Sequence, residues 1–390
     1  MKIIPYGKQE ITDADIEATV RVLRSDYLTQ GPEIREFETA FAAYTGAAYA
    51  VAVANGTAAL HLAAMALGVE AGQKVITTPI TFAASANCVE YCGAEAVFSD
   101  IDPETYLLDL TVLRQQLLAD KSIKGIIPVQ FAGRMVDMEQ LRQLADEFGL
   151  WIIEDACHAP GAYFSDSSGT KHYAGNGVFA ECSVFSFHPV KHIAAGEGGM
   201  ITTNDKALYD RLCLLRTHGI TRNTELFQHT PEAIGGEQDF PLWYMEMQEL
   251  GYNYRLTDFQ AALGRSQLAR ADEGLKKRRA IAARYAEAFA GESFVYGQSG
   301  SVEGHAYHLY ILEVADRLGL YNYLRTKGIY VQIHYIPCHL MPYYRNKKGG
   351  QKELPVAEAY YQKCISLPMY PTLTEEEQQF VIQTVKSYYE

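Results

Sequence analysis

Residues 125–155 read GIIPVQFAGRMVDMEQLRQLADEFGLWIIED, and they set the expected fold class. Apolar runs at 125–129 and 150–154 predict two strands, and residues 137–148 between them repeat their apolar side chains on one helical face. Gly149 predicts the end of that helix, because glycine tolerates the left-handed conformation of a helix C-terminus. Strands joined by a helix are typical of a parallel sheet that helices cover on both faces. The stretch therefore predicts an α/β protein.

The same alternation of apolar runs and helical stretches continues on both sides of this segment. Together with the first two, five further runs predict a mostly parallel sheet of seven strands; they cover residues 49–54, 74–77, 96–99, 182–187 and 199–202. Upstream, Thr12-Asp13-Ala14-Asp15 has the pattern of a capping box and predicts the start of a helix. Sheets of this kind bind ligands at the carboxyl ends of their strands, so we expect the functional site there.

The pattern changes past residue 250. It predicts one or two long helices, then two strands, then a capped final helix, at residues 257–290, 308–314, 330–334 and after Thr374. A chain of 390 residues is long for one hydrophobic core. We therefore expect a large domain over residues 1–250 and a smaller α+β domain over residues 251–390.

Net charge and hydropathy argue against several classes of protein. The net charge of −13 argues against a nucleic-acid binder, which normally presents a basic face, although a local pocket could still take an anionic substrate. The N-terminal residues show neither a signal-peptide core nor a cleavage site, and no apolar run is long enough to cross a membrane. We expect a cytoplasmic protein that binds neither nucleic acid nor membrane.

The seven cysteines point the same way. Their number is odd and their spacing is scattered, which indicates reduced thiols rather than a disulfide framework. Cys88 and Cys92 lie four residues apart and Cys157 adjoins His158, but a metal site would need a second paired cluster. We expect no metal.

A first candidate site segment is NGTAAL, residues 55–60, at a strand-to-helix turn. The unpaired N–H groups at a helix start favour a phosphate, and Gly56 lets the backbone come close to it. Thr57 adds a hydroxyl, and Ala58 adds a third N–H group. Alone, the segment is equally typical of an ordinary turn between a strand and a helix.

A second segment is WIIEDACH, residues 151–158, where an apolar strand ends in Glu154 and Asp155. A buried strand rarely ends in this way unless the charge has a partner. The alternative is a pair of solvated acids in a turn. A third segment, residues 183–191, reads SVFSFHPVK and runs into GEGG at 196–199. It would present Ser186 and Lys191 from a turn, although an arbitrary lysine is most often a surface residue.

Together the three segments supply what pyridoxal phosphate chemistry requires. Lys191 is the amine that could form a Schiff base with the cofactor. Asp155 is the carboxylate that could face the pyridine nitrogen and keep it protonated. At ~4 Å and an effective dielectric of ~20, such an ion pair is worth about 4 kcal/mol, or roughly three pKa units. Phosphate donors would come from the turn at 56–58 and from Ser186.

At these residues the chain resembles the sugar aminotransferases related to the DegT and StrS proteins. The stretches that carry the resemblance span the chain: LTQGP (28–32), NGTAAL (55–60), TPITFAASAN (78–87), EDACHA (154–159), SFHPVKHI (186–193), GEGG (196–199), GYNYRLTDFQAALG (251–264) and HYIP (334–337). The resemblance implies the type I fold of pyridoxal phosphate enzymes. It also implies pyridoxal 5'-phosphate as cofactor.

The resemblance also implies roles for individual residues. Lys191 would carry the cofactor, and Asp155 would be the partner of its pyridinium nitrogen. Phe82 would stack on the ring, and His158 would lie near the 3-hydroxyl group. Asn253 would reach the phosphate in a neighbouring subunit, so the working unit would be a homodimer with shared active sites.

Four further residues would line the sugar-nucleotide site by the same resemblance: Tyr6, Tyr27, Thr29 and His334. Each could equally be an ordinary residue of a surface loop. A dehydratase branch of the family has histidine in place of the lysine, so the presence of Lys191 favours transamination.

Within the family the chain is most similar to the 4-aminotransferases of pseudaminic acid biosynthesis. This implies a UDP-linked 4-keto-6-deoxy-N-acetylhexosamine as amino acceptor and glutamate as amino donor. Ala194-Ala195 departs from the small hydroxyl residues expected after SFHPVKHI. The alternatives are an aminotransferase for another 3- or 4-keto sugar linked to dTDP or GDP, and a non-catalytic regulator with the same fold.

Overall fold

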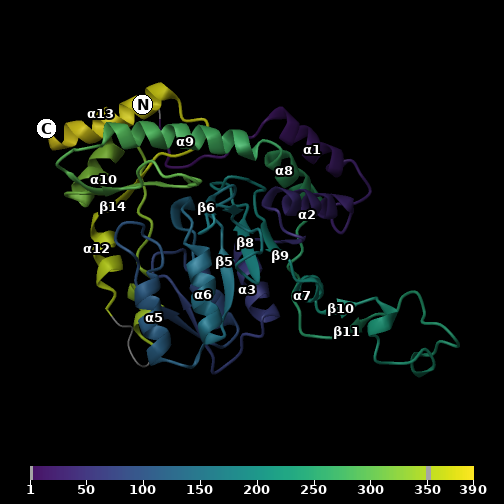
Figure 1. Cartoon of the computed structure of the whole chain (residues 1–390). Helices are drawn as coiled ribbons and strands as arrows, with labels where there is room; N and C mark the ends of the chain where they lie inside the picture. The colour runs from purple at the N-terminus through teal and green to yellow at the C-terminus, as the bar shows by residue number, and fades with distance from the viewer. Residues whose placement is uncertain (1–2, 348–352) are drawn as a thin grey trace.

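The computed structural model describes residues 3–347 and 353–390. Figure 1 shows a central sheet between layers of helices, a long helix above it, and an arm that projects from one side. Among the described residues, none of the helices combines the length and the apolar character needed to cross a membrane.

The central sheet has seven strands in the order β1-β9-β8-β5-β4-β2-β3. Their bounds are β1 (Tyr49–Val53), β2 (Lys74–Thr77), β3 (Glu95–Phe98), β4 (Ile123–Ile127), β5 (Trp151–Asp155), β8 (Cys182–Ser186) and β9 (Gly199–Thr203). β9 is antiparallel to both neighbours, and the other pairs are parallel. The mostly parallel sheet and all seven predicted strands are confirmed.

Helices cover both faces of this sheet. α5 (Leu110–Ala119) and α6 (Met138–Phe148) pack together on one face, while α3 (Gly56–Ala66), α4 (Ala84–Tyr91) and α7 (Lys206–Arg216) form the other layer. The helix predicted between β4 and β5 is confirmed as α6. The Asp137 carboxylate accepts the Gln140 N–H at 2.9 Å at its start, and Gly149 ends it with φ 67°.

Three helices pack beside the sheet. α1 (Asp13–Leu23) and α2 (Pro32–Thr45) both pack on α8 (Asp258–Leu268). The predicted capping box at Thr12 is present, since Thr12 and Asp15 exchange hydrogen bonds at the start of α1. α9 (Ala271–Ala288) continues from α8 and is the long helix across the top of Figure 1.

A second core surrounds a three-stranded antiparallel sheet of β12 (Val295–Gln298), β13 (Tyr310–Val314) and β14 (Cys364–Leu367). The helices that pack around it are α9, α10 (Arg317–Thr326) and α13 (Glu375–Tyr389). Ile4, near the N-terminus, belongs to the same core. Thr374 caps α13 as predicted. The division of the chain at residue 250 stays a prediction.

The strand predicted at residues 330–334 is wrong. Within this segment the described residues form a single bridge, Gln332 with Ser366, and the bridge between Ile4 and Ile329 lies just before it. The physical reason is that residues 332–336 all line one cavity, whereas a strand turns successive side chains to opposite faces.

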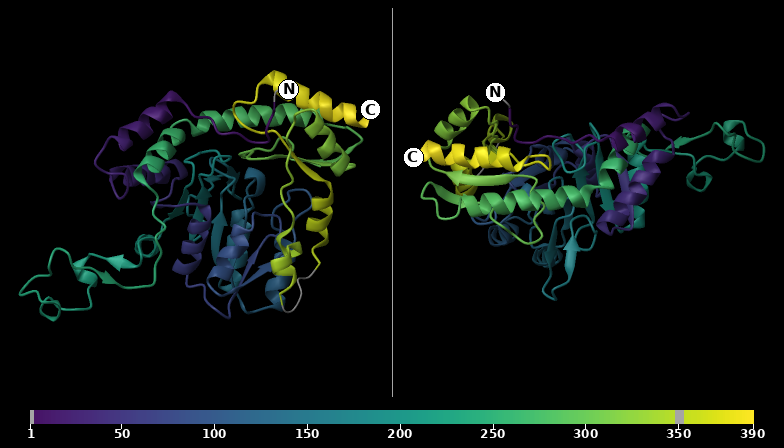
Figure 2. Two further views of the ribbon diagram at one scale, coloured as in Figure 1. Left: turned by 180° about the vertical axis from the view of Figure 1, so that it is seen from behind. Right: turned by 90° about the horizontal axis from the view of Figure 1, so that it is seen from above.

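The remaining short elements connect these layers: β6 (Tyr163–Ser165), β7 (Lys171–Tyr173), β10 (Ile220–Thr221), β11 (Glu246–Met247), α11 (Pro342–Arg345) and α12 (Pro355–Lys363). The β10–β11 pair is the base of the projecting arm, which Figures 1 and 2 show standing away from the sheet. The arm carries exposed apolar side chains: the Leu242 side chain is fully exposed, and Trp243 is 69% exposed. Nothing in the sequence analysis anticipated this arm.

Candidate active site

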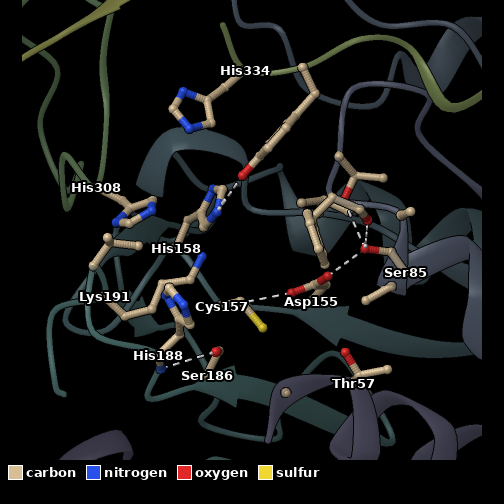
Figure 3. Close-up of a pocket in the computed structure, with 18 of the residues that line it drawn as sticks. Thr57, Ser85, Asp155, Cys157, His158, Ser186, His188, Lys191, His308 and His334 are labelled. Atoms are coloured by element: carbon tan, nitrogen blue, oxygen red, sulfur yellow. Dashed lines mark hydrogen bonds between the residues drawn. The ribbon is translucent and has the colours of Figure 1, made fainter. Parts of the chain in front are cut away.

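A cavity of about 680 Å³ lies at the carboxyl ends of the central strands. Asp155 enters it from the end of β5, Ser186 from the end of β8, and Gly56 from the start of α3. The cavity is therefore at the edge of the sheet where such folds bind ligands. Figure 3 shows Asp155 and Ser186 in the same pocket as Lys191.

One end of the cavity is the N-terminus of α3. The N–H groups of Gly56 and Thr57 lie in the first helical turn and have no helical acceptor, while Asn55 accepts the Ala58 N–H at 2.8 Å. A Cβ at position 56 would lie 2.9 Å from the Ser186 Cβ, so only glycine fits there. The end offers two backbone donors and the Ser186 hydroxyl to an anion, whereas Ala58 does not line the cavity and its N–H is engaged.

Asp155 is buried near the other side of the cavity. Its Oδ2 accepts the Ser85 hydroxyl at 2.6 Å, and its Oδ1 accepts the Cys157 N–H at 3.1 Å. The Ser85 hydroxyl also shares a hydrogen bond with Thr81 at 2.8 Å. These neutral donors hold the carboxylate in place without cancelling its charge.

Glu154, the other acid at this strand end, points away from the cavity. Its carboxylate accepts hydrogen bonds from Gln130 at 2.8 Å, Ser183 at 2.6 Å and the Gly175 N–H at 3.0 Å, and burial raises its pKa. Successive side chains of a strand point to opposite faces, which explains why the two acids separate. Glu154 therefore stabilises the structure and leaves Asp155 as the acid of the site.

Lys191 extends into the cavity from the turn after β8, where its N–H donates to the His188 carbonyl at 2.8 Å. Its amine makes no hydrogen bond to the described residues. Burial lowers the pKa of Lys191, and the positive charge of Arg278 adds to this, while Cys157 and Asp155 act in the opposite direction. A larger share of the neutral amine, which is the nucleophilic form, follows from this environment.

His158 lies between two neighbours that fix its protonation. Its Nδ1 accepts the Ala132 N–H at 3.3 Å, so the ring proton of the neutral form lies on Nε2, 3.3 Å from the Tyr335 hydroxyl. Its ring centroid is 4.2 Å from that of His308. Burial and the nearby Lys191 hold the pKa of His158 well below its usual value, so the ring is neutral.

Three more of the residues predicted from the sequence line the same cavity. Phe82 is 64% exposed at its wall, with its ring edge-on to Tyr335. Tyr6 lies 5.4 Å from His334, ring to ring, and the His334 Nδ1 is 2.8 Å from the Ser366 hydroxyl. Burial lowers the pKa of His334 to about 3.

Tyr27, Thr29 and Asn253 are not brought to the cavity within one chain. All three are exposed, and Thr29 and Asn253 form single bridges with Thr257 and Thr217. Their predicted roles stay predictions.

Three residues that contact the site carry no predicted role: Ser85, His308 and Tyr335. Ser85 and Tyr335 lie inside stretches already singled out, TPITFAASAN and HYIP, and His308 begins a predicted strand. Only their positions in space reveal what they contact.

The residues of the cavity fit pyridoxal phosphate. An anion site at the α3 N-terminus, a buried carboxylate and an amine without a hydrogen bond meet in one enclosed space. The anion site would hold the phosphate group, the carboxylate would face the ring nitrogen, and the amine would react with the carbonyl carbon. Over residues 3–347 and 353–390, no group of three or more His, Cys, Asp or Glu side chains is arranged to hold a metal ion.

Sequence comparison places this geometry among known proteins. The DegT/DnrJ/EryC1/StrS aminotransferase family matches residues 9–386. The spore coat polysaccharide biosynthesis protein SpsC of Bacillus subtilis is 35% identical over 98% of this chain and 96% of that protein. A UDP-4-amino-4,6-dideoxy-N-acetyl-beta-L-altrosamine transaminase of Campylobacter jejuni is 34% identical over 99% of this chain and 97% of that protein.

Solved structures agree with the sequence comparison. PseC of Helicobacter pylori, an aminotransferase of pseudaminic acid biosynthesis, superposes with a TM-score of 0.88 at 28% identity over 100% of this chain and 99% of that chain. Spr1654 of Streptococcus pneumoniae, described as a sugar aminotransferase, was solved in a pyridoxal phosphate form. It superposes with a TM-score of 0.87 at 29% identity over 99% of this chain and 98% of that chain.

Proposed function

Since the chain belongs to the DegT/DnrJ/EryC1/StrS family of pyridoxal-phosphate-dependent sugar aminotransferases, we propose a specific reaction for it. Its acceptor is a UDP-linked 4-keto-6-deoxy-N-acetylhexosamine, its donor is glutamate, and its product is the 4-amino sugar of a pseudaminic acid pathway. The similarity to the Campylobacter and Helicobacter proteins supports this choice. We place the reaction in the cytoplasm, in keeping with seven cysteines that form no disulfide.

A second candidate is amination of another 3- or 4-keto sugar linked to dTDP or GDP. The relative from Bacillus subtilis supports this second candidate. That protein is about as similar to this chain as the Campylobacter transaminase is, and it is named for the biosynthesis of a spore coat polysaccharide. Overall identity therefore does not separate the two candidates.

Pyridoxal phosphate, when bound, supplies an electron-poor ring that accepts the electron pair left on a carbon when its proton is removed. Lys191 would attach the cofactor through its amine and, once free, would accept and return a proton at its Nζ. Its lowered pKa suits both tasks, because a neutral amine can attack and can also accept a proton. One residue thus serves as anchor and as base.

Asp155 orients and holds the ring nitrogen in its charged form. Its position is fixed by Ser85 and by the Cys157 N–H, so the carboxylate does not have to reorganise during the reaction. The exposed Phe82 side chain would stack on the ring, and the neutral His158, which lies within hydrogen-bond distance of Tyr335, would lie near the 3-hydroxyl group.

The phosphate is bound by the Gly56 and Thr57 N–H groups and by the Ser186 hydroxyl. Each charge-assisted bond contributes about 1.5–3 kcal/mol, more than the ~0.3–1 kcal/mol of the helix dipole. Tyr6 and His334 line the space left for the sugar nucleotide.

The observation that carries the proposal is the Lys191 amine, which makes no hydrogen bond to any residue of the described chain and extends into a cavity shared with Asp155 and the α3 N-terminus. Borohydride reduction of the holoenzyme followed by peptide mass mapping tests it, and we expect a pyridoxyl group on Lys191. A pyridoxyl group on any other lysine would contradict the site. A panel of UDP-, dTDP- and GDP-linked keto sugars then tests the substrate, with amination of the UDP-linked 4-keto sugar expected to be fastest.

We also propose that the enzyme is a homodimer in which Asn253, Tyr27 and Thr29 complete the site of the partner. The exposure of all three, away from the cavity of their own chain, supports this. In a mixture of Lys191→Ala and Asn253→Ala subunits, each hybrid dimer would carry one site with both defects and one intact site. Activity should therefore reappear on mixing, and a mixture as inactive as its parents would contradict shared sites.

A further inference from the structure

Lys191 also lines a second, smaller cavity of about 190 Å³, which the proposed reaction does not use. The N-terminal segment near Lys8 forms one wall, and the first turns of α9 near Gly274 form another. Figures 1 and 2 show the N-terminal chain running alongside α9. Basic side chains outnumber carboxylates in the lining: Lys8, Lys191, Arg270, Lys277 and Arg278 against Glu10 and Glu273.

The two carboxylates are already paired. Glu273 lies 2.7 Å from Lys277, and Glu10 lies 3.4 Å from Arg270, which also bonds the buried Asp15 at 2.7 Å. No acidic side chain among the described residues pairs with Lys8 or with Arg278. The uncompensated charge of this cavity is therefore positive, on a protein whose net charge is −13.

Arg278 is the strongest sign of a ligand. Its side chain is buried, and its Nη1 donates to three carbonyl oxygens, those of Tyr307 at 3.1 Å, His308 at 3.3 Å and Met369 at 3.0 Å. The Nε group is buried without a partner, and Nη2 makes no hydrogen bond to the described residues. This free edge of the guanidinium matches two oxygens of a carboxylate or phosphate, and a buried charge left without such a partner is costly.

Gly274 keeps the cavity open. It is an interior residue of α9, where glycine is a poor helix former. A Cβ at this position would meet only the Pro371 Cγ, at an ordinary 3.6 Å, so the backbone does not require glycine. Ala194, the residue at which the sequence departs from the family pattern, lines this cavity and not the larger one.

We propose that this second cavity binds a small oxyanion, a carboxylate or a phosphate, at the guanidinium of Arg278, and that the anion brings a negative charge close to Lys191. Arg278 is one of the groups that lower the pKa of Lys191, so an anion that offsets its charge would raise that pKa. By linkage, the protonated form of the Lys191 nitrogen binds the anion more tightly. The site thereby couples anion concentration to the protonation of the catalytic nitrogen, whichever sugar the enzyme uses.

The test uses the holoenzyme, in which the cofactor phosphate occupies the larger site. Acetate, inorganic phosphate and chloride are titrated by calorimetry at constant ionic strength. We expect acetate or phosphate to bind saturably and chloride, a single-atom acceptor without the paired oxygens that match two parallel N–H groups, to bind at least about tenfold more weakly. The tighter of the two oxyanions identifies the chemical class of the ligand.

Gly274→Leu fills the cavity, and Gly274→Ala is its matched control. Oxyanion affinity should fall at least about tenfold in the leucine variant and stay within about twofold in the alanine variant. Arg278→Lys keeps the charge but loses the two-pronged edge, and it should weaken binding similarly. Binding that survives in Gly274→Leu would come from the larger cavity and would overturn the proposal, as would equal binding of chloride or no oxyanion binding.

A second readout on the wild-type holoenzyme does not depend on any variant folding. The visible absorbance reports protonation of the nitrogen that joins Lys191 to the cofactor. A saturating oxyanion should move the midpoint of its pH titration upward, because negative charge favours the protonated form. An unmoved midpoint would show that the cavity does not communicate with Lys191 and would overturn the coupling.

Discussion

Asp155 and Glu154 are adjacent in the sequence, but their side chains point in opposite directions and have different hydrogen-bond partners. Both are buried at the end of β5, but alternation along the strand turns one into the cavity and the other into a network of Gln130, Ser183 and Gly175. Asp155 receives only neutral donors, so its charge remains available to a cationic ring nitrogen. At the scale of single residues, Ser85 is therefore the group on which the orientation of the acid depends.

We expect Asp155→Asn to lower kcat by about a thousandfold, because removing an ion pair worth ~4 kcal/mol leaves the ring nitrogen less charged. Ser85→Ala should cost roughly ten- to a hundredfold, the value of one hydrogen bond to a charged group. Steady-state kinetics and the absorbance spectrum of the bound cofactor measure both effects.

The matched control is Ser99→Ala, since the Ser99 hydroxyl is buried without a hydrogen-bond partner among the described residues. It should leave kcat unchanged. Equal losses in Ser85→Ala and Ser99→Ala would mean that the effect reflects packing and not the orientation of Asp155.

At the scale of elements, the turn between β1 and α3 builds the anion end of the cavity. Asn55 caps the helix through the Ala58 N–H, and this leaves the two preceding N–H groups available. The close approach of Ser186 from β8 makes Gly56 necessary. The start of α3 and the end of β8 therefore form one anion site only because the fold brings them next to each other.

We expect Gly56→Ala to weaken cofactor binding by roughly ten- to a hundredfold. The new methyl group would lie 2.9 Å from the Ser186 Cβ, so the helix start must shift and lose at least one phosphate bond. Fluorescence titration of the apoenzyme with pyridoxal phosphate measures the dissociation constant.

Gly7→Ala serves as the control, because its added Cβ would make only ordinary contacts, the nearest at 3.6 Å from the Val190 Cβ. Unchanged cofactor affinity in Gly56→Ala would argue that the α3 N-terminus does not bind the phosphate.

At the scale of the whole molecule, six histidines have surroundings that change their titration: His61, His158, His192, His305, His308 and His334. Burial lowers the pKa of every one, and for His305 and His334 it lowers the pKa to about 3. These rings are neutral in the folded protein, but in the unfolded chain each would take up a proton below its ordinary pKa of 6.5. The unfolded state therefore binds more protons than the folded state over this range.

Stability should consequently fall as the pH drops from about 6.5 toward 3. Each such histidine contributes up to about 1.4 kcal/mol per pH unit to the loss in the free energy of unfolding. Urea denaturation of the apoenzyme at pH 5 and pH 7 measures the loss. In His305→Asn the dependence should be shallower, whereas His229→Asn, a change at an exposed position of the arm, should leave it unaltered. Parallel slopes in all three proteins would contradict the assignment.

Local patterns in the chain predict most of the elements and the leading chemical candidates. Side-chain periodicity and contacts within four residues, which the sequence displays directly, predict the seven strands, α6 and the capped starts of α1 and α13. The three segments that carry Gly56, Asp155 and Lys191 were identified in the same way, with help from a family resemblance.

Tertiary structure alone decided what those candidates contact. Ser85 reaches Asp155 across 70 residues of sequence, and Tyr335 reaches His158 across 177. The 330–334 segment lines a cavity instead of forming a strand, and Arg278 lines a space bounded by the N-terminal segment. Such contacts depend on strand order and on which buried groups find partners, and neither leaves a local periodicity in the chain.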